Sequence, residues 1–192
     1  MRNEKRLLSN RRIAILITVV VAVLATMWGV NRTSARYTRD IEAMFYDGVY
    51  LKDDGYTEQS ISAHLDNSEQ VVLRLATVLV NYPELSDKAE SSLSYRRELI
   101  AAKSIGDKSS AYIRMRDQFI ELTDAAKRAD LSARDMEAVT QDSTVFNGAS
   151  IAILNSRYND KVTEYFEGRS AIARMIGVFT PTKAPAFFLA SY

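Results

Sequence analysis

The sequence IAILITVVVAVLATMWGV, which begins at Ile13 and ends at Val30, contains 18 residues and no charge. As a helix it would rise about 27 Å at 1.5 Å per residue, close to the roughly 30 Å thickness of the hydrocarbon core of a bilayer. No other uncharged run in the chain is as long. The sequence therefore predicts a transmembrane helix over residues 13–30, followed by a separate domain of residues 31–192.

Basic residues flank this apolar run unequally. The tail of residues 1–12 contains five Arg or Lys and one Glu, whereas residues 31–42 contain three Arg, one Asp and one Glu. The positive-inside rule then places the short tail in the cytoplasm and residues 31–192 outside it. Trp28, near the outer end of the run, suits an interfacial aromatic anchor.

A cleaved signal peptide is the alternative interpretation of the same segment. Thr33, Ser34 and Ala35 resemble a cleavage site between small residues. The apolar core of a signal peptide usually has about 7–15 residues, and this run is longer. We therefore favour a retained anchor, and both interpretations place the domain outside the cytoplasm.

Composition excludes several functional classes. The chain has 25 basic and 24 acidic residues, and the basic excess lies before the span, so the outer domain is slightly acidic and unsuited to nucleic acid. It contains no cysteine, which rules out disulfides, thiolate nucleophiles and zinc–sulfur sites. His64 is the only histidine, and Ile61 stands where a di-metal bundle needs Glu. We expect no catalytic residue, cofactor or metal site.

The outer domain is predicted to be all-α, forming a long antiparallel helical bundle. Gly and Pro are scarce, at seven and three residues. Residues 33–45 continue the membrane helix, and further helices are expected over residues 57–82, 84–105 and 108–129. In residues 57–82 the core positions alternate spacings of four and three, typical of a bundle or coiled-coil seam. The expected core residues are Ile61, Leu65, Ser68, Val72, Leu75, Leu79, Tyr82, Leu85, Ala89, Leu93, Ile100, Ala111, Met115, Phe119, Leu122 and Ala126, with Gly106 as a helix cap.

One long final helix is predicted over residues 132–168. Ser132 and Asp135 resemble a capping box at its start, and about 36 residues would give a rod of roughly 54 Å. A short amphipathic stretch, residues 171–179, and an apolar end, APAFFLASY, follow it. This end either packs along the bundle or forms an exposed docking strip. The expected inner stripe of the long helix is Met136, Val139, Ser143, Phe146, Ser150, Ile153, Val162 and Tyr165.

The segment RYNDKVTEYF, residues 157–166, resembles the closing motif of the LemA family, R-x-YN-x-x-V-x-x-[YF]N. The N-terminal span, a Tyr-Pro pair at 82–83, Arg96 or Arg97, Phe179 and a Phe pair at 187–188 agree in order. Ser156 occupies the motif's Arg position, Phe166 replaces its last Asn, and the family's R-x-D-L-I-P-N-L-V stretch has no clean counterpart. The chain thus resembles a divergent member. The resemblance implies a membrane-anchored bundle facing outward from the bacterial cytoplasmic membrane, with no enzymatic activity.

Two groups of residues are candidates for binding. Tyr158 and Asn159, with Arg157 beside them and Tyr165 two turns on, form either a buried hydrogen-bonded clasp between helices or a contact patch for a partner. The loop of residues 47–56 carries tyrosines among acidic residues, which suits either loop packing or ligand recognition.

Two functions follow as hypotheses. The first is a non-catalytic envelope scaffold or interaction protein, whose partners are the membrane, other envelope proteins and also a second copy of the chain. The second is an extracytoplasmic sensory or ligand-binding bundle that signals through a separate membrane partner. With only about 12 residues predicted inside the cytoplasm, a sensor would need such a partner, so we favour the scaffold.

Overall fold

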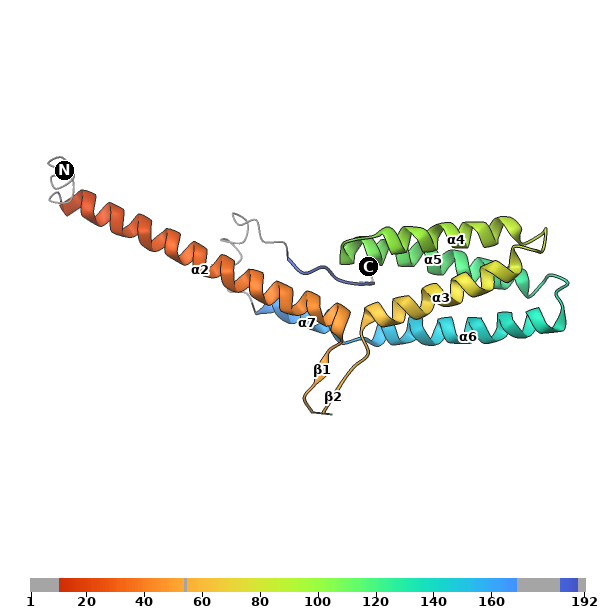
Figure 1. Cartoon of the computed structure of the whole chain (residues 1–192). Coiled ribbons are helices and arrows are strands. Elements are labelled where there is room, and N and C mark those ends of the chain that lie inside the picture. The colour runs from red at the N-terminus through yellow and green to blue at the C-terminus, as the bar shows by residue number, and fades with distance from the viewer. Residues whose placement is uncertain (1–10, 54, 169–183, 190–192) are drawn as a thin grey trace. The chain divides into compact units, whose positions relative to one another are not determined.

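The computed structural model describes residues 11–53, 55–168 and 184–189, and most of them are helical, as predicted. They form two compact units, which are described separately: residues 11–40 with 164–168 and 184, and residues 41–163 with 185–189, apart from residue 54. In chain order the elements are α2 (Arg11–Asp47), β1 (Tyr50–Leu51), β2 (Tyr56–Thr57), α3 (Ile61–Leu79), α4 (Ser86–Ala101), α5 (Ile105–Ala126), α6 (Ala133–Asn155) and α7 (Tyr158–Glu167) (Figure 1).

Helix α2 contains the apolar run. It is long and apolar enough to cross a membrane by length and composition, a test that an N-terminal signal sequence also passes. Most large apolar side chains of the run are exposed, among them Leu16 and Trp28 at 64% and 74%. The predicted continuation beyond Val30 is confirmed, since the helix runs unbroken to Asp47.

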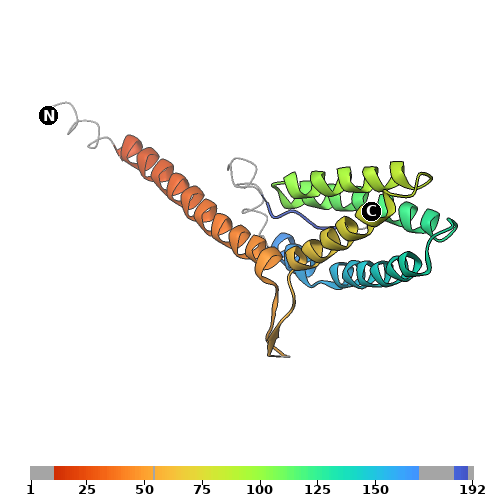
Figure 2. The ribbon, with the colours of Figure 1, turned by 45° about the vertical axis from the view of Figure 1, so that its right-hand side comes forward.

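The second unit is built around four helices that run alternately in opposite directions (Figures 1 and 2). Helix α3 packs against both α4 and α6, and α4 packs against α5. The predicted seam of α3 is confirmed from Ile61 to Leu79, where all six expected core positions are buried. The five predicted core residues of α5 are buried as well, and Tyr112 joins them. Tyr82 is only half-buried, because α3 ends before it and the chain turns toward Pro83.

The prediction for α4 was partly wrong. Leu85 and Ala89 are buried, but Leu93 is half-buried and Ile100 is exposed; Ser92 and Leu99 occupy the core instead. Polar Ser92 can face the core because its hydroxyl donates a 2.9 Å hydrogen bond to the Lys88 carbonyl within the helix. Gly106 is not a cap of α4, because α4 has ended at Ala101 and Gly106 lies in the first turn of α5.

The predicted final helix is two helices, α6 and α7. Its start is correct: the Asp135 N–H donates to the Ser132 hydroxyl at 3.1 Å. Val139, Phe146 and Ile153 are buried as expected, whereas Met136, Ser143 and Ser150 are half-buried. The break occurs at Ser156, whose backbone is extended.

Two side chains compensate the break between α6 and α7. The Tyr158 N–H donates to the Ser156 hydroxyl at 3.3 Å, and the Arg157 N–H donates to the Glu58 carboxylate at 3.2 Å. These amides begin a new helix and would otherwise lack acceptors. Glu58, which follows β2, therefore helps to terminate one helix and start the next.

The loop predicted over residues 47–56 contains a short antiparallel hairpin that we did not predict, which follows Gly48 and has Gly55 in its turn. Strands β1 and β2 pair Tyr50 with Thr57 and Leu51 with Tyr56. Gly48 has φ of 89°, and a Cβ there would lie 1.9 Å from the Glu58 carbonyl oxygen. The hairpin also delays α3, which begins at Ile61 rather than Thr57.

Candidate functional site: a clasp on the C-terminal segment

The residues predicted around the LemA-like motif do not act together. Tyr158 is buried and Asn159 half-buried, and both contact residues 185–189, which we call the C-terminal segment. Arg157 has an exposed side chain and contributes its main-chain amide to Glu58. Tyr165 belongs to the first unit, where its ring stacks on Tyr37 with centroids 5.6 Å apart.

The side-chain amide of Asn159 forms hydrogen bonds with both the N–H and the C=O of Phe188. Its Nδ2 donates to the Phe188 carbonyl oxygen at 2.6 Å, and the Phe188 N–H donates to its Oδ1 at 3.0 Å. One side-chain amide thereby satisfies both polar groups of one peptide residue, as a neighbouring strand would. We predicted a clasp between neighbouring helices, but Asn159 binds the C-terminal segment instead.

Tyr158 supports the segment two residues earlier, where its hydroxyl donates to the Ala186 carbonyl oxygen at 2.8 Å. Burial raises the pKa of Tyr158, and the neighbouring Glu42 and Tyr46 raise it further. The phenol therefore remains protonated at neutral pH and keeps its role as donor. Substitution of Asn159 or Tyr158 would strand main-chain groups of the segment.

An aromatic pocket receives the side chain of Phe188, which is 1% exposed. The Phe188 ring centroid lies 5.3 Å from that of Phe45 on α2 and 6.0 Å from that of Tyr112 on α5. Phe45 also meets Tyr158 edge to face at 5.6 Å. Because such pairs gain energy beyond area burial, Phe188 is the apolar anchor of the segment.

The segment ends in an unusual backbone conformation. Leu189 has φ of 52°, in the left-handed region, where a non-glycine residue costs about 1–2 kcal/mol. In this conformation its N–H donates to the Ser109 hydroxyl at 3.0 Å. A hydrogen bond donated to α5 therefore accompanies the strain, and side chains of α5 and α7 together bind the main chain of residues 186–189.

The apolar end of the chain packs on the bundle over the described residues 185–189, so that part is not an exposed docking strip. Pro185 and Phe188 are buried, while Phe187 is 39% exposed. The predicted amphipathic stretch 171–179, including Phe179, lies outside the described residues. The side chains that contact residues 186–189 are those of Ser109, Tyr112, Tyr158, Asn159 and Phe45, and we call this set of residues the clasp groove.

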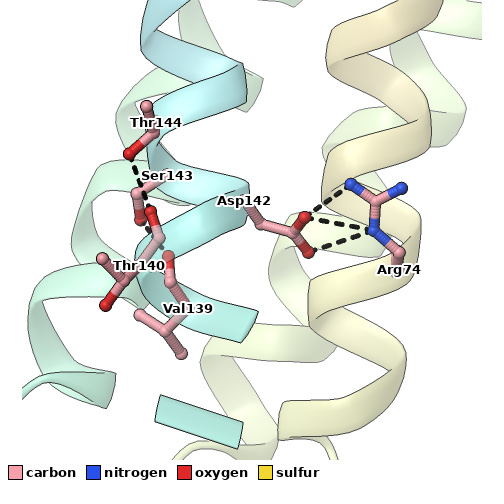
Figure 3. A network of polar contacts seen from close by, with 6 residues as sticks. All are labelled: Arg74, Val139, Thr140, Asp142, Ser143 and Thr144. Carbon is pink, nitrogen blue, oxygen red and sulfur yellow. Dashed lines mark hydrogen bonds and ion pairs between the residues drawn. The ribbon is translucent and has the colours of Figure 1, made fainter. Parts of the chain in front are cut away.

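A second polar site links α3 to α6 and was missed from the sequence. The Asp142 side chain is only 6% exposed, and both its oxygens accept hydrogen bonds from Arg74 Nε, at 3.1 and 3.2 Å (Figure 3). These hydrogen bonds raise the pKa of Arg74. The signal was available: Asp142 lies three residues after Val139 and four before Phe146, within the predicted core stripe. An acidic residue at such a position requires a cationic partner.

The loop of residues 47–56 does not present one aromatic platform. Tyr46, Tyr50 and Tyr56 are 46%, 63% and 54% exposed. In the hairpin register Tyr50 pairs with Thr57 and Tyr56 with Leu51, so the two strand tyrosines point to opposite faces. Their arrangement does not favour stacking of one ligand on both rings.

An open surface hollow of about 580 Å³ lies where α4 leads into α5. The Arg114 Nη2 lies 2.9 Å from the Glu98 carboxylate at its wall, so these two opposite charges are paired. No group of three or more His, Cys, Asp or Glu suited to a metal ion occurs within residues 11–53, 55–168 and 184–189. The lining residues are Glu98, Ala101, Ala102, Lys103, Asp107, Ser110, Ala111 and Arg114.

No protein-family model, curated protein or solved structure matches the chain. Its class therefore rests on fold and site. It is a mostly helical protein with an N-terminal apolar helix long enough to cross a membrane. Its second unit contains a helical bundle that grips the C-terminal segment by main-chain hydrogen bonds and one aromatic anchor.

Proposed function

We propose that this chain is a divergent LemA-like protein, anchored by one span in the bacterial cytoplasmic membrane, whose outward-facing bundle is a non-catalytic scaffold for envelope proteins. The main observation that supports this proposal is the course of helix α2. It is one unbroken helix that contains the whole apolar run, and near its C-terminal end Ile41 and Phe45 are buried in the second unit. Such a helix joins a membrane anchor directly to a folded interaction module.

The side-chain chemistry supports a binding role over catalysis. The chain has one histidine and no cysteine, and His64 is half-buried on α3. Burial lowers the pKa of His64, and the nearby Glu58 carboxylate partly opposes this effect. The polar contacts described above join elements of the fold: Arg74 on α3 binds Asp142 on α6, and Asn159 on α7 binds the main chain of Phe188.

Topology can be tested with single cysteines because the natural chain has none. Ser94→Cys, at an exposed position of α4, should react with a membrane-impermeant maleimide in intact cells. The matched variant Ser9→Cys in the N-terminal tail should react only after lysis. Reaction of Ser94→Cys only after lysis would contradict the proposed orientation, and release of the chain by alkaline extraction would contradict the anchor.

If the chain is a scaffold, its partners should bind only when the bundle is folded. Photo-crosslinkers at exposed positions of α5 and α6 should capture the same envelope proteins repeatedly, and destabilising the bundle with Leu75→Asp should abolish capture without removing the chain from the membrane. An exposed substitution, Glu121→Ala, is the control. Unchanged capture with the disrupted bundle would refute the scaffold.

The open hollow where α4 leads into α5 favours a second candidate, a ligand-binding sensor. Its lining of both charge signs suits a small zwitterion such as a free amino acid. Thermal stabilisation by an amino acid that is lost in Arg114→Ala, but retained in Arg97→Ala, would favour this function. Absence of stabilisation across the amino acids would leave the scaffold as the better account.

A further inference from the structure

The clasp groove binds the C-terminal segment in the way that a protein binds an extended peptide. The Tyr158 and Asn159 side chains and the Ser109 hydroxyl all bond to main-chain atoms of residues 186–189. Main-chain recognition with a pocket for one side chain is how proteins bind extended peptides. Phe188 supplies that side chain, and the exposed Phe187 beside it does not enter the pocket.

Residues of the clasp groove also make contacts that do not involve the segment. Tyr112 stacks on Phe146 with centroids 6.3 Å apart, and Phe45 meets Tyr158 at 5.6 Å. The Tyr112 hydroxyl lies 2.8 Å from the Ser150 hydroxyl, which ties α5 to α6. The pocket is therefore held by contacts among the helices, and a peptide that enters it meets a largely formed site.

The geometry points to exchange of this segment between copies: the clasp groove of one chain binds residues 185–189 of a second copy. A second copy is the occupant that the structure supports, because it presents the same carbonyls, amide and Phe188 ring that the groove already binds. The contacts named above would be identical in either arrangement, as in domain swapping. This inference rests on the proposed membrane anchor, because anchoring in one membrane raises the local concentration of copies and so favours exchange.

Two differently tagged full-length chains test the exchange in membranes. One carries Ser109→Cys in the groove and the other Leu189→Cys in the segment, positions that a 3.0 Å hydrogen bond brings together. A short bismaleimide should link them into a heterodimer. Replacing Ser109→Cys by Glu121→Cys, about 18 Å further along α5, is the control for random collision and should give little heterodimer.

Asn159→Ala makes the test directional. In the chain that carries Ser109→Cys it removes two hydrogen bonds to the incoming segment, so heterodimer should fall roughly tenfold or more. In the chain that carries Leu189→Cys it only loosens that chain's own clasp, and heterodimer should hold or rise. Equal loss in both arrangements would indicate general unfolding and overturn the proposal.

The double variant Ser109→Cys with Leu189→Cys in one chain tests the alternative that each segment binds only the groove of its own chain. Internal cross-linking without any heterodimer would show that the segment stays in its own groove, which overturns exchange. Absence of both products would show that the clasp does not form and would also overturn it. Neither result affects the anchor and orientation, which the Ser94→Cys labelling and alkaline extraction measure separately.

Discussion

The pair Arg74–Asp142 predicts an unequal response to the loss of its two members. The Asp142 side chain is 6% exposed and that of Arg74 60% exposed. Arg74→Met therefore leaves a buried carboxylate without its cation, a change that costs about 3–5 kcal/mol for fully buried pairs. Because water can partly occupy the exposed position of Arg74, we expect about 2–3 kcal/mol here.

The reverse substitution should be mild. Asp142→Leu leaves Arg74 at the surface, where it remains hydrated, and places an apolar side chain between α3 and α6. We expect the free energy of unfolding to stay within about 1 kcal/mol of the parent, since hydrophobic replacement of buried ion pairs is often neutral. The double variant Arg74→Met with Asp142→Leu should likewise recover most of the stability lost in Arg74→Met.

Urea unfolding of the full chain in detergent micelles, followed by circular dichroism, measures the three variants. At about 2–4 °C per kcal/mol, Arg74→Met should also lower the melting temperature by roughly 4–12 °C. Arg97→Met, at an exposed arginine of α4, is the control and should stay within about 0.5 kcal/mol. If the double variant were destabilised by the sum of the single effects, the two side chains would be uncoupled and the reasoning refuted.

Three further predictions concern the clasp, the core and pH. Asn159→Leu should lower the free energy of unfolding by about 1–3 kcal/mol, because it strands the N–H and C=O of Phe188; a thermal melt equal to that of Thr163→Ala would contradict this. Leu75→Asp should cost several kcal/mol in urea, because it places an unpaired charge in the α3 seam, whereas Glu121→Ala should be near neutral; matching midpoints would disprove the seam. Burial lowers the pKa of His64 below 6.5 in the folded chain, so the unfolded chain binds this proton more tightly. The free energy of unfolding therefore decreases as the pH falls below 6.5. His64→Gln should therefore lose less stability than the parent between about pH 7 and pH 5, and parallel curves for the two chains would exclude this role.

Features set by neighbouring residues were predictable. The uncharged run from Ile13 predicted a long apolar helix, and the spacing of Ile61, Leu65 and Leu75 predicted the buried face of α3. Ser132 predicted the start of α6, because an N-cap needs only an amide three residues on. In α4, by contrast, the prediction that Leu93 and Ile100 face the core was wrong, because the helix turns Ser92 and Leu99 toward the core instead.

The sequence by itself thus determined the helical class, the apolar N-terminal helix and most seam residues, because periodicity and capping act within a few residues. Tertiary structure alone decided the partner of Asn159, 29 residues away, the pairing of Arg74 with Asp142, 68 residues away, and the contact of Arg157 with Glu58, 99 residues away. These contacts depend on which helices the turns bring side by side. The break at Ser156 has the same origin, because an extended residue there becomes favourable only when a distant carboxylate accepts the amide that it frees.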